Sequence, residues 1–187
     1  MKTPLLNDPK LLDKAIQEIQ VILGTLSFID KSFGLAEPRT REKKIYPAVY
    51  QGENLDEYEV SPKDDIKAFC FWDKADPISL IYPEDREPSK MKYTNLSYNV
   101  SLIFYTFDVK RLDLASDVRQ SETIIMQEFL KTLQRGLLTA QSVLIIEEIW
   151  DDDIKEIYKG YDVDPIKQPE YAIRFNCKLS FRESCYQ

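Results

Sequence analysis

A twelve-residue stretch near the C-terminal end, residues 171–182, alternates its side chains with a period of two. One set of positions is apolar: Ile173, Phe175, Cys177, Leu179 and Phe181. The other set is Ala172, Arg174, Asn176, Lys178, Ser180 and Arg182. A β-strand sends successive side chains to opposite faces, so this pattern predicts an antiparallel strand with one buried face. The chain must therefore build a sheet with a core against that face.

Two amphipathic helices are expected beside this sheet. Asp8 is a suitable N-cap and Pro9 suits the first helical position, and apolar residues follow at helical spacing as far as Leu26. This helix should end near residues 24–27. A second helical pattern begins at about residue 116 or 121 and reaches residue 135, where Gly136 is expected to be the C-cap.

Four further strands are predicted, at residues 45–50, 66–72, 93–107 and 143–150. Pro47 places the first of them at a sheet edge or a strand start, because proline donates no backbone hydrogen bond. The stretch 93–107 is apolar on both faces, which predicts a central strand. Strands in runs separated by two helices predict an α+β fold, a mostly antiparallel β-sheet packed with two main helices, in a single domain spanning residues 1–187.

Several stretches are expected to lie outside the sheet. Residues 30–44 are polar and irregular, and residues 51–59 suit an acidic turn. Residues 73–92 carry three prolines and predict a proline-rich excursion or long loop, a kind of segment that is often functional in compact domains. Residues 151–157 suit a short helical turn that stops at Gly160.

The residue types present exclude several kinds of chemistry. The chain of 187 residues has no histidine, which excludes histidine-based catalytic triads and histidine metal ligands. Five glycines leave no phosphate-binding fingerprint. The three cysteines, Cys70, Cys177 and Cys185, are widely spaced and give no metal-ligand pattern, so reduced thiols in a cytosolic setting are expected. We expect no cofactor, no metal and no enzymatic activity.

The charge of the chain bears on its partners. A net charge of −7 and a pI near 4.8 argue against a protein that grips nucleic acid over a broad surface. No apolar stretch is long enough to span a bilayer, and the first residues lack the apolar core of a signal peptide. A soluble protein that binds neither a membrane nor a specific nucleic-acid sequence is expected.

One acidic cluster lies beside a predicted strand. It consists of Glu147, Glu148, Asp151, Asp152 and Asp153, with Lys155 close behind. Carboxylates and a lysine at a strand end suit a metal-dependent nuclease, because hard cations take oxygen ligands. The alternative is a solvated strand edge and helix N-terminus, where acidic side chains interact favourably with the helix dipole. Acidic runs of this kind are usually surface features.

Basic and aromatic side chains supply the remaining candidate interaction residues. Arg39, Arg41, Lys43 and Lys44 form a cluster that would dock an acidic partner or phosphate, or be a solvated loop. Arg174, Lys178 and Arg182 are expected to form an exposed row that would pair across a subunit boundary or protect an edge strand. Trp150 beside the acidic run is a candidate interface residue.

The layout of the chain resembles that of the small tail-terminator or tail-completion proteins of tailed bacteriophages. The resemblance covers an N-terminal amphipathic helix, a Tyr-Pro strand at residues 44–47 and a long excursion. It continues with a helix ending at Gly136, the strand at 143–146, the turn at 157–161 and the final strand from Tyr171. It is a resemblance of element order and carries no diagnostic motif, so no functional residue is transferred from the family.

The resemblance implies an α+β protein that assembles as a ring, usually a hexamer. Such rings cap the head-proximal end of the tail tube, stop its polymerisation and present a surface to a head-completion protein, and they catalyse no reaction. The expected partners are copies of this chain, the tail tube protein and a head-completion protein. The expected location is the virion tail, after assembly in the bacterial host cytoplasm.

Two other functions stay open at the level of the sequence. One is an acidic protein-binding module of the immunity or inhibitor type, which masks a basic partner. The other is a metal-dependent hydrolase that uses the cluster Glu147–Asp153. For a ring-forming protein, the candidate contact elements are an exposed sheet edge and the loop 73–92.

Overall fold

A computed structural model describes residues 3–51, 56–60, 66–81, 93–135, 142–151, 157–162 and 171–184; side chains are described in these ranges except at 75–81, 93–95, 135 and 182–184. Two α-helices are present in this part, α1 (Leu11–Leu23) and α2 (Val118–Arg135), with a short 3₁₀ helix, η2 (Val109–Leu112). The strands are β1 (Lys31–Arg41), β2 (Lys44–Gln51), β3 (Asp56–Glu59), β4 (Ala68–Ile81), β5 (Tyr93–Thr106), β6 (Ser142–Trp150) and β7 (Tyr171–Ser184).

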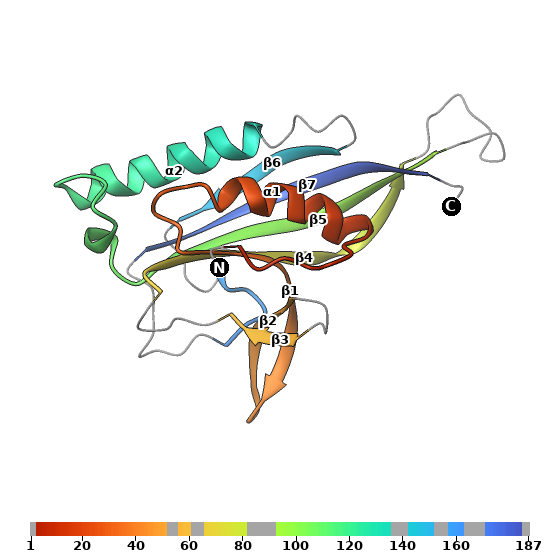
Figure 1. The fold of residues 1–187 in the computed structure, drawn as a ribbon, viewed down its shortest axis with the longest axis horizontal. Helices are drawn as coiled ribbons and strands as arrows, with labels where there is room; N and C mark the ends of the chain where they lie inside the picture. Colours follow the sequence, from red (N-terminus) through yellow and green to blue (C-terminus); the bar gives the residue numbers. More distant parts are fainter. Residues whose placement is uncertain are drawn as a thin grey trace.

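These strands form one seven-stranded sheet in the order β3-β2-β1-β4-β5-β7-β6 (Figure 1). All neighbouring strands are antiparallel except β1 and β4, which are parallel. The predicted α+β class is confirmed. The expected central position of the strand 93–107 is also confirmed, because β5 lies between β4 and β7.

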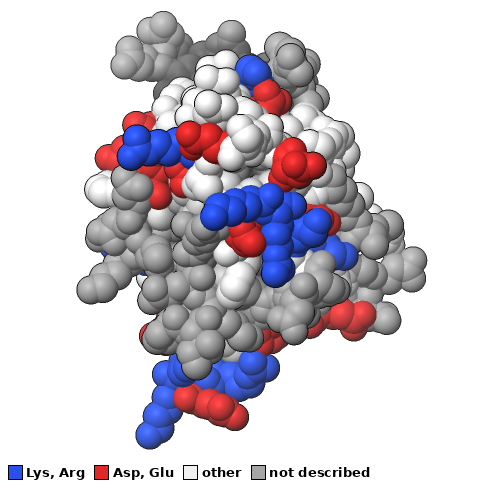
Figure 2. Space-filling model, turned by 90° about the vertical axis from the view of Figure 1, so that its left-hand side faces the viewer, with Lys and Arg blue, Asp and Glu red and all other residues white. Residues whose placement is uncertain are grey.

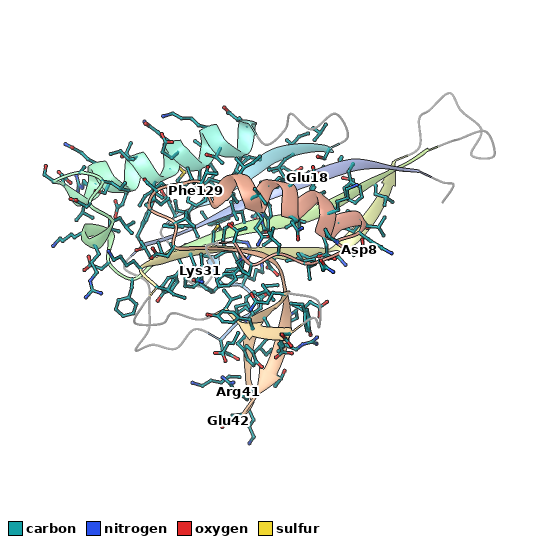
Figure 3. All side chains as sticks on the ribbon, in the orientation of Figure 1. Asp8, Glu18, Lys31, Arg41, Glu42 and Phe129 are labelled. Atoms are coloured by element: carbon teal, nitrogen blue, oxygen red, sulfur yellow. The ribbon has the colours of Figure 1, made fainter. Side chains whose placement is uncertain are left out.

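Both helices lie on the same face of the sheet (Figure 1). The main core fills the space between them and the sheet, and Phe129 of α2 lies in this layer (Figure 3). The predicted apolar face of the last strand is confirmed, because its side chains are all buried here: Ile173, Phe175, Cys177, Leu179 and Phe181. Burial of these side chains supplies a large part of the hydrophobic free energy that joins the helices to the sheet.

The opposite face of the sheet, called the open face below, carries a second and smaller core. It includes Phe33, Phe69, Phe71 and Tyr105, covered by Ile157 and Tyr158. The covering segment, residues 157–162, is tied to β2 at Ile45. The Ile45 N–H donates to Asp162 Oδ2 (2.6 Å), and the Asp162 N–H donates to the Ile45 carbonyl (2.7 Å).

The description of residues 30–44 as irregular is wrong. Residues 31–41 form β1, which turns through Glu42 and Lys43 into β2, with Arg41 paired to Lys44. Both turn residues have positive φ, 52° and 67°, as two-residue hairpin turns of the primed type require. Gly34 and Pro38 interrupt the alternation that would reveal this strand in the sequence.

β1 pairs with β4 as far as Leu35 and, beyond that residue, with β2 alone. The hairpin formed by β1 and β2, with β3 beside it, therefore projects from the body of the molecule (Figure 1). We call the outer end of this hairpin, residues 41–44, the tip.

Two expectations about this region need correction. β2 is not an edge strand, because β1 and β3 flank it. Pro47 is accommodated opposite Pro38, and its carbonyl accepts from the Val60 N–H on the far side (2.9 Å), so its missing donor faces away from β1. The predicted acidic turn at 51–59 contains a strand, β3; residues 52–55 lie outside the described part.

The start of the first helix also differs from its prediction. The N-cap position is occupied by Lys10 rather than Asp8, and no side chain caps the helix there. The N-terminal segment instead folds back along the helix, because Gln17 and Gln20 bind the backbone of Leu6 and Pro4. The predicted end near residue 24 is confirmed at Gly24.

The expected excursion at 73–92 is partly strand, since β4 continues to Ile81; residues 82–92 lie outside the described part. The predicted C-cap Gly136 and residues 152–156 of the predicted acidic turn also lie outside it. Gly160 follows the turn at 157–159 and has a φ of 95°, which glycine adopts without strain. Among the described helices, none is long and apolar enough to cross a membrane.

Candidate functional site on the open face of the sheet

Four polar side chains form a row across the open face. The strand register places Asp73 of β4 opposite Ser101 of β5, Ser101 opposite Asn176 of β7, and Asn176 opposite Glu148 of β6. Ser101 Oγ donates to Asn176 Oδ1 (2.8 Å), and Asn176 Nδ2 donates to Glu148 Oε2 (3.1 Å). These hydrogen bonds fix the direction of the Glu148 carboxylate.

Arg174 lies on the same face of β7, two residues before Asn176, and is buried, so its prediction as an exposed residue is wrong. Its Nη2 donates to Asp73 Oδ2 (3.1 Å), its Nη1 to the Ile157 carbonyl (3.0 Å) and its Nε to Asn176 Oδ1 (3.0 Å). The side chains of Arg174 and Asp73 are only 9% and 13% exposed. The segment that carries Ile157 covers this ion pair, and a sequence pattern contains no information about what covers a sheet face.

Burial dominates the titration of Asp73. Loss of hydration raises the pKa of its carboxyl above 3.8, while hydrogen bonds and the nearby Arg174 charge lower it in part. The Tyr161 hydroxyl donates to Asp73 Oδ1 (2.8 Å), and the pKa of Tyr161 is raised mainly by burial. This cluster joins β4, β7 and the segment 157–162, so its first role is structural.

The expected basic row on the last strand is not formed as predicted. Lys178 is half-buried, between Asn99 and Ile145 in the register, and the Arg182 side chain lies outside the described part. β7 is also not an edge strand, since β5 and β6 flank it. These charges therefore do not protect a free edge.

The free edge at this end of the sheet belongs to β6, which has β7 as its one partner among the described strands. Its open-face side chains include Val143 and Ile145, each 52% exposed, and Trp150, 40% exposed. The register shifts between Ile146 and Glu148, so Glu147 is an extra residue at a bulge. An exposed edge with apolar side chains favours association with another chain.

An open pocket of about 450 Å³ adjoins the polar row and this edge. Its lining includes Glu147, Glu148, Trp150, Lys159, Arg174 and Asn176. Trp150 Nε1 donates to Glu148 Oε2 (3.4 Å), so one carboxylate oxygen of Glu148 accepts from both Trp150 and Asn176. We call this arrangement the β6 pocket.

The predicted acidic cluster is described only in part. Glu147, Glu148 and Asp151 are exposed, whereas Asp152, Asp153 and Lys155 lie outside the described residues. Within the part of the chain that the structure describes, no group of three or more His, Cys, Asp or Glu side chains is placed to hold a metal ion.

The predicted basic cluster lies at the hairpin, not in a loop. Arg39 forms ion pairs with Glu37 (3.0 Å) and Glu57 (3.3 Å), and Arg41 pairs with Glu59. Lys43 and Lys44 are exposed at the tip, and neither forms an ion pair with a described residue. Figure 2 shows the tip at the bottom of the molecule as a group of basic side chains around acidic ones.

The buried thiols and a second pocket are less suited to function. Cys70 and Cys177 are free and buried, and burial raises the pKa of each to about 12, which keeps them protonated and unreactive. Cys185 lies outside the described part. A pocket of about 220 Å³ between α1 and β1 contains Asp13, whose pKa is raised by burial and by Glu37.

Sequence reasoning found Glu148, Trp150 and the tip, but missed Asp73, Ser101 and Asn176. Asp73 and Ser101 adjoin strongly apolar stretches, which is a usable signal for those two, whereas Asn176 lies among other polar residues on its strand face. No protein-family model matches this chain. No curated protein matches it either.

Proposed function

We propose that this chain is a non-enzymatic structural protein of a phage or prophage tail. It acts as a ring-forming tail terminator or completion protein that caps the tail tube and joins it to the head. The observation that carries the self-assembly in this proposal is the free β6 edge. Val143 and Ile145 are half exposed there, on the side of β6 that pairs with no other described strand. Covering such an edge with a neighbouring subunit removes apolar surface from water and satisfies backbone donors and acceptors.

The composition and element order support the same function. A chain without histidine lacks the commonest general acid and base. The α+β class of the fold is the class that the phage-tail resemblance implies. A net charge of −7 suits a ring whose lumen must pass DNA without retaining it.

The test is the solution mass of the full chain, measured by light scattering across concentration and salt, with negative-stain images of the large species. A closed ring of several subunits is expected, and adding the tail tube protein of the same phage should yield capped tubes of limited length. A monomer at every concentration, with or without tube protein, contradicts the proposal. It would favour the acidic protein-binding module, for which exposed Glu147 and Asp151 would supply the contact surface.

A further inference from the structure

The two ends of the sheet carry unlike surfaces. The tip, at the end of the β1–β2 hairpin, presents exposed Lys43 and Lys44. The β6 pocket, at the far end, presents Glu147, Glu148 and Trp150. In the sheet order, β1, β4, β5 and β7 lie between β2 and β6 (Figure 1). Lys43 and Lys44 are exposed and do not line the β6 pocket of their own chain.

The charge available at the tip is that of its lysines. The arginines nearby are engaged within the hairpin region: Arg39 with Glu37 and Glu57, and Arg41 with Glu59. Arg41 also lies over the Tyr46 ring, 5.1 Å from its centroid. These contacts hold the arginines within the hairpin and leave Lys43 and Lys44, both exposed, as the cations that a partner outside the chain can pair.

The β6 pocket has the groups that bind a primary ammonium ion. Asn176 and Trp150 both donate to Oε2 of Glu148, which orients the carboxylate. Oε1 accepts no hydrogen bond from a described residue, so it is placed to accept from a ligand. The face of an exposed tryptophan attracts cations. Two cations also line the pocket: Arg174, which is paired with Asp73, and Lys159.

From this complementarity, and resting on the self-assembly in the proposed function, we infer that the β6 pocket binds the hairpin tip of a second copy of this chain. A lysine ammonium of one subunit enters the pocket beside Trp150 and Glu148 of the next. Because the two surfaces differ and lie at opposite ends of the sheet, the contact is head-to-tail, and repeated contacts of this kind close into a ring when the rotation permits. The tip is too small for a broad grip on nucleic acid, which takes many phosphate contacts.

The experiment is sedimentation velocity on the full chain and four variants. Lys43→Glu/Lys44→Glu reverses the charge of the tip. Glu147→Lys/Asp151→Lys reverses the charge of one pocket residue and of the exposed residue that follows Trp150. Trp150→Ala removes the aromatic wall of the pocket. Lys14→Glu/Lys110→Glu is the matched control, since both residues are exposed and the change in net charge equals that of the tip variant. Circular dichroism confirms that each variant is folded.

Each charge-reversed variant, and also Trp150→Ala, should self-associate at least about tenfold more weakly than the unmodified chain. The control variant should self-associate as strongly as the unmodified chain. An equimolar mixture of the two reversed variants should recover the assembly, because each mixed contact pairs opposite charges. Association should also weaken with salt.

Three results overturn the inference. If the unmodified chain assembles and the tip variant assembles equally well, or if the mixture recovers nothing, the tip and pocket do not meet, while self-assembly stands. If the tip variant loses affinity for labelled duplex DNA and assembles normally, the tip binds nucleic acid instead. If the unmodified chain is monomeric, the proposed self-assembly itself fails and this contact fails with it.

Discussion

At the residue scale, the guanidinium of Arg174 is held by three elements at once. It binds Asp73 of β4, Asn176 of its own strand and the carbonyl of Ile157 in the covering segment. When an ion pair is buried, the attraction between its charges offsets only part of the free energy lost with their hydration. Removing one partner also removes this attraction and leaves an uncompensated buried charge. The cost of that loss is larger than the net contribution of the intact pair.

Arg174→Met is therefore expected to lower the free energy of unfolding by about 3 kcal/mol at neutral pH. Adding Asp73→Asn should cost less than the sum of the two single changes, because the second change removes the stranded charge. Urea unfolding of the four proteins measures this coupling. Lys178→Met, at the half-buried position four residues along β7, is the control and should change stability much less. Additive effects would contradict a coupled pair.

The carboxyl of Asp73 should titrate above 3.8, because burial is the largest influence on its pKa. Its midpoint should rise further in Arg174→Met, since the guanidinium lowers the pKa. With the folded-state pKa above the unfolded one, the carboxyl stabilises the fold most below pH 3.8, and this contribution is lost as the pH rises through the folded-state pKa. Carboxyl NMR measures the midpoint. The difference in unfolding free energy between the unmodified chain and Asp73→Asn should shrink as the pH rises.

At the element scale, the hairpin turn places two ordinary residues in the left-handed region. Glu42 and Lys43 have φ values of 52° and 67°. Side chains with a Cβ adopt this conformation at a cost, which asparagine and glycine reduce. The turn sequence is thus a poor match to its own geometry.

Glu42→Asn should raise the free energy of unfolding by about 0.5 kcal/mol, because asparagine tolerates positive φ better. Thermal unfolding measures the shift. The control is Lys44→Asn, at the neighbouring strand position without positive φ, where no gain is expected. A gain at Lys44 equal to that at Glu42 would show that the turn conformation is not the cause.

Elements with an uninterrupted period were predictable from sequence, and the contacts between them were not. α2, β5 and β7 follow from their spacing, whereas Gly34 and Pro38 conceal β1. The helix start was wrong because the N-terminal segment binds Gln17 and Gln20, a tertiary contact that competes with capping by Asp8. Arg174 occupies an alternating position that indicates exposure, and its burial depends on a segment some seventeen residues away.

The candidate site was even less accessible to sequence reasoning. Its polar row takes one residue from each of β4, β5, β7 and β6, and the register of those strands decides that Asp73, Ser101, Asn176 and Glu148 line up. Hydrophobic period predicts which face a side chain takes but not which residue stands opposite it. Trp150 and the lysines of the tip were accessible, because exposed charge and an isolated tryptophan stand out in sequence.

At the scale of the whole molecule, one sheet separates a projecting hairpin from an apolar free edge. The polar row and the smaller core lie between them on the open face. An assembly built on these surfaces leaves α1 and α2 on the other face, available to contact something else. The fold is therefore suited to a subunit with neighbours on more than one side.

Ile145→Lys is expected to weaken self-association about tenfold or more while leaving the fold intact, because a lysine on an edge strand opposes pairing with another chain. Light scattering and circular dichroism measure the two effects. Val21→Lys on α1 is the control, since Val21 is exposed to a similar degree (46%) on a different surface. Equal weakening by both variants would indicate a general charge effect and not a contact at β6.

The position of β7 has a consequence for synthesis of the chain. Among the described strands, β6 has β7 as its sole partner, and β7 also pairs with β5 along its whole length. While residues 171–184 are still inside the ribosome, β6 lacks the one described strand that pairs with it. The edge of β5 that later pairs with β7 is also unpaired at that stage. Polysomes that translate this message place many such chains close together. The sheet is complete only when β7 pairs between β5 and β6, so emergence of residues 171–184 from the ribosome sets the moment at which β6 acquires its partner.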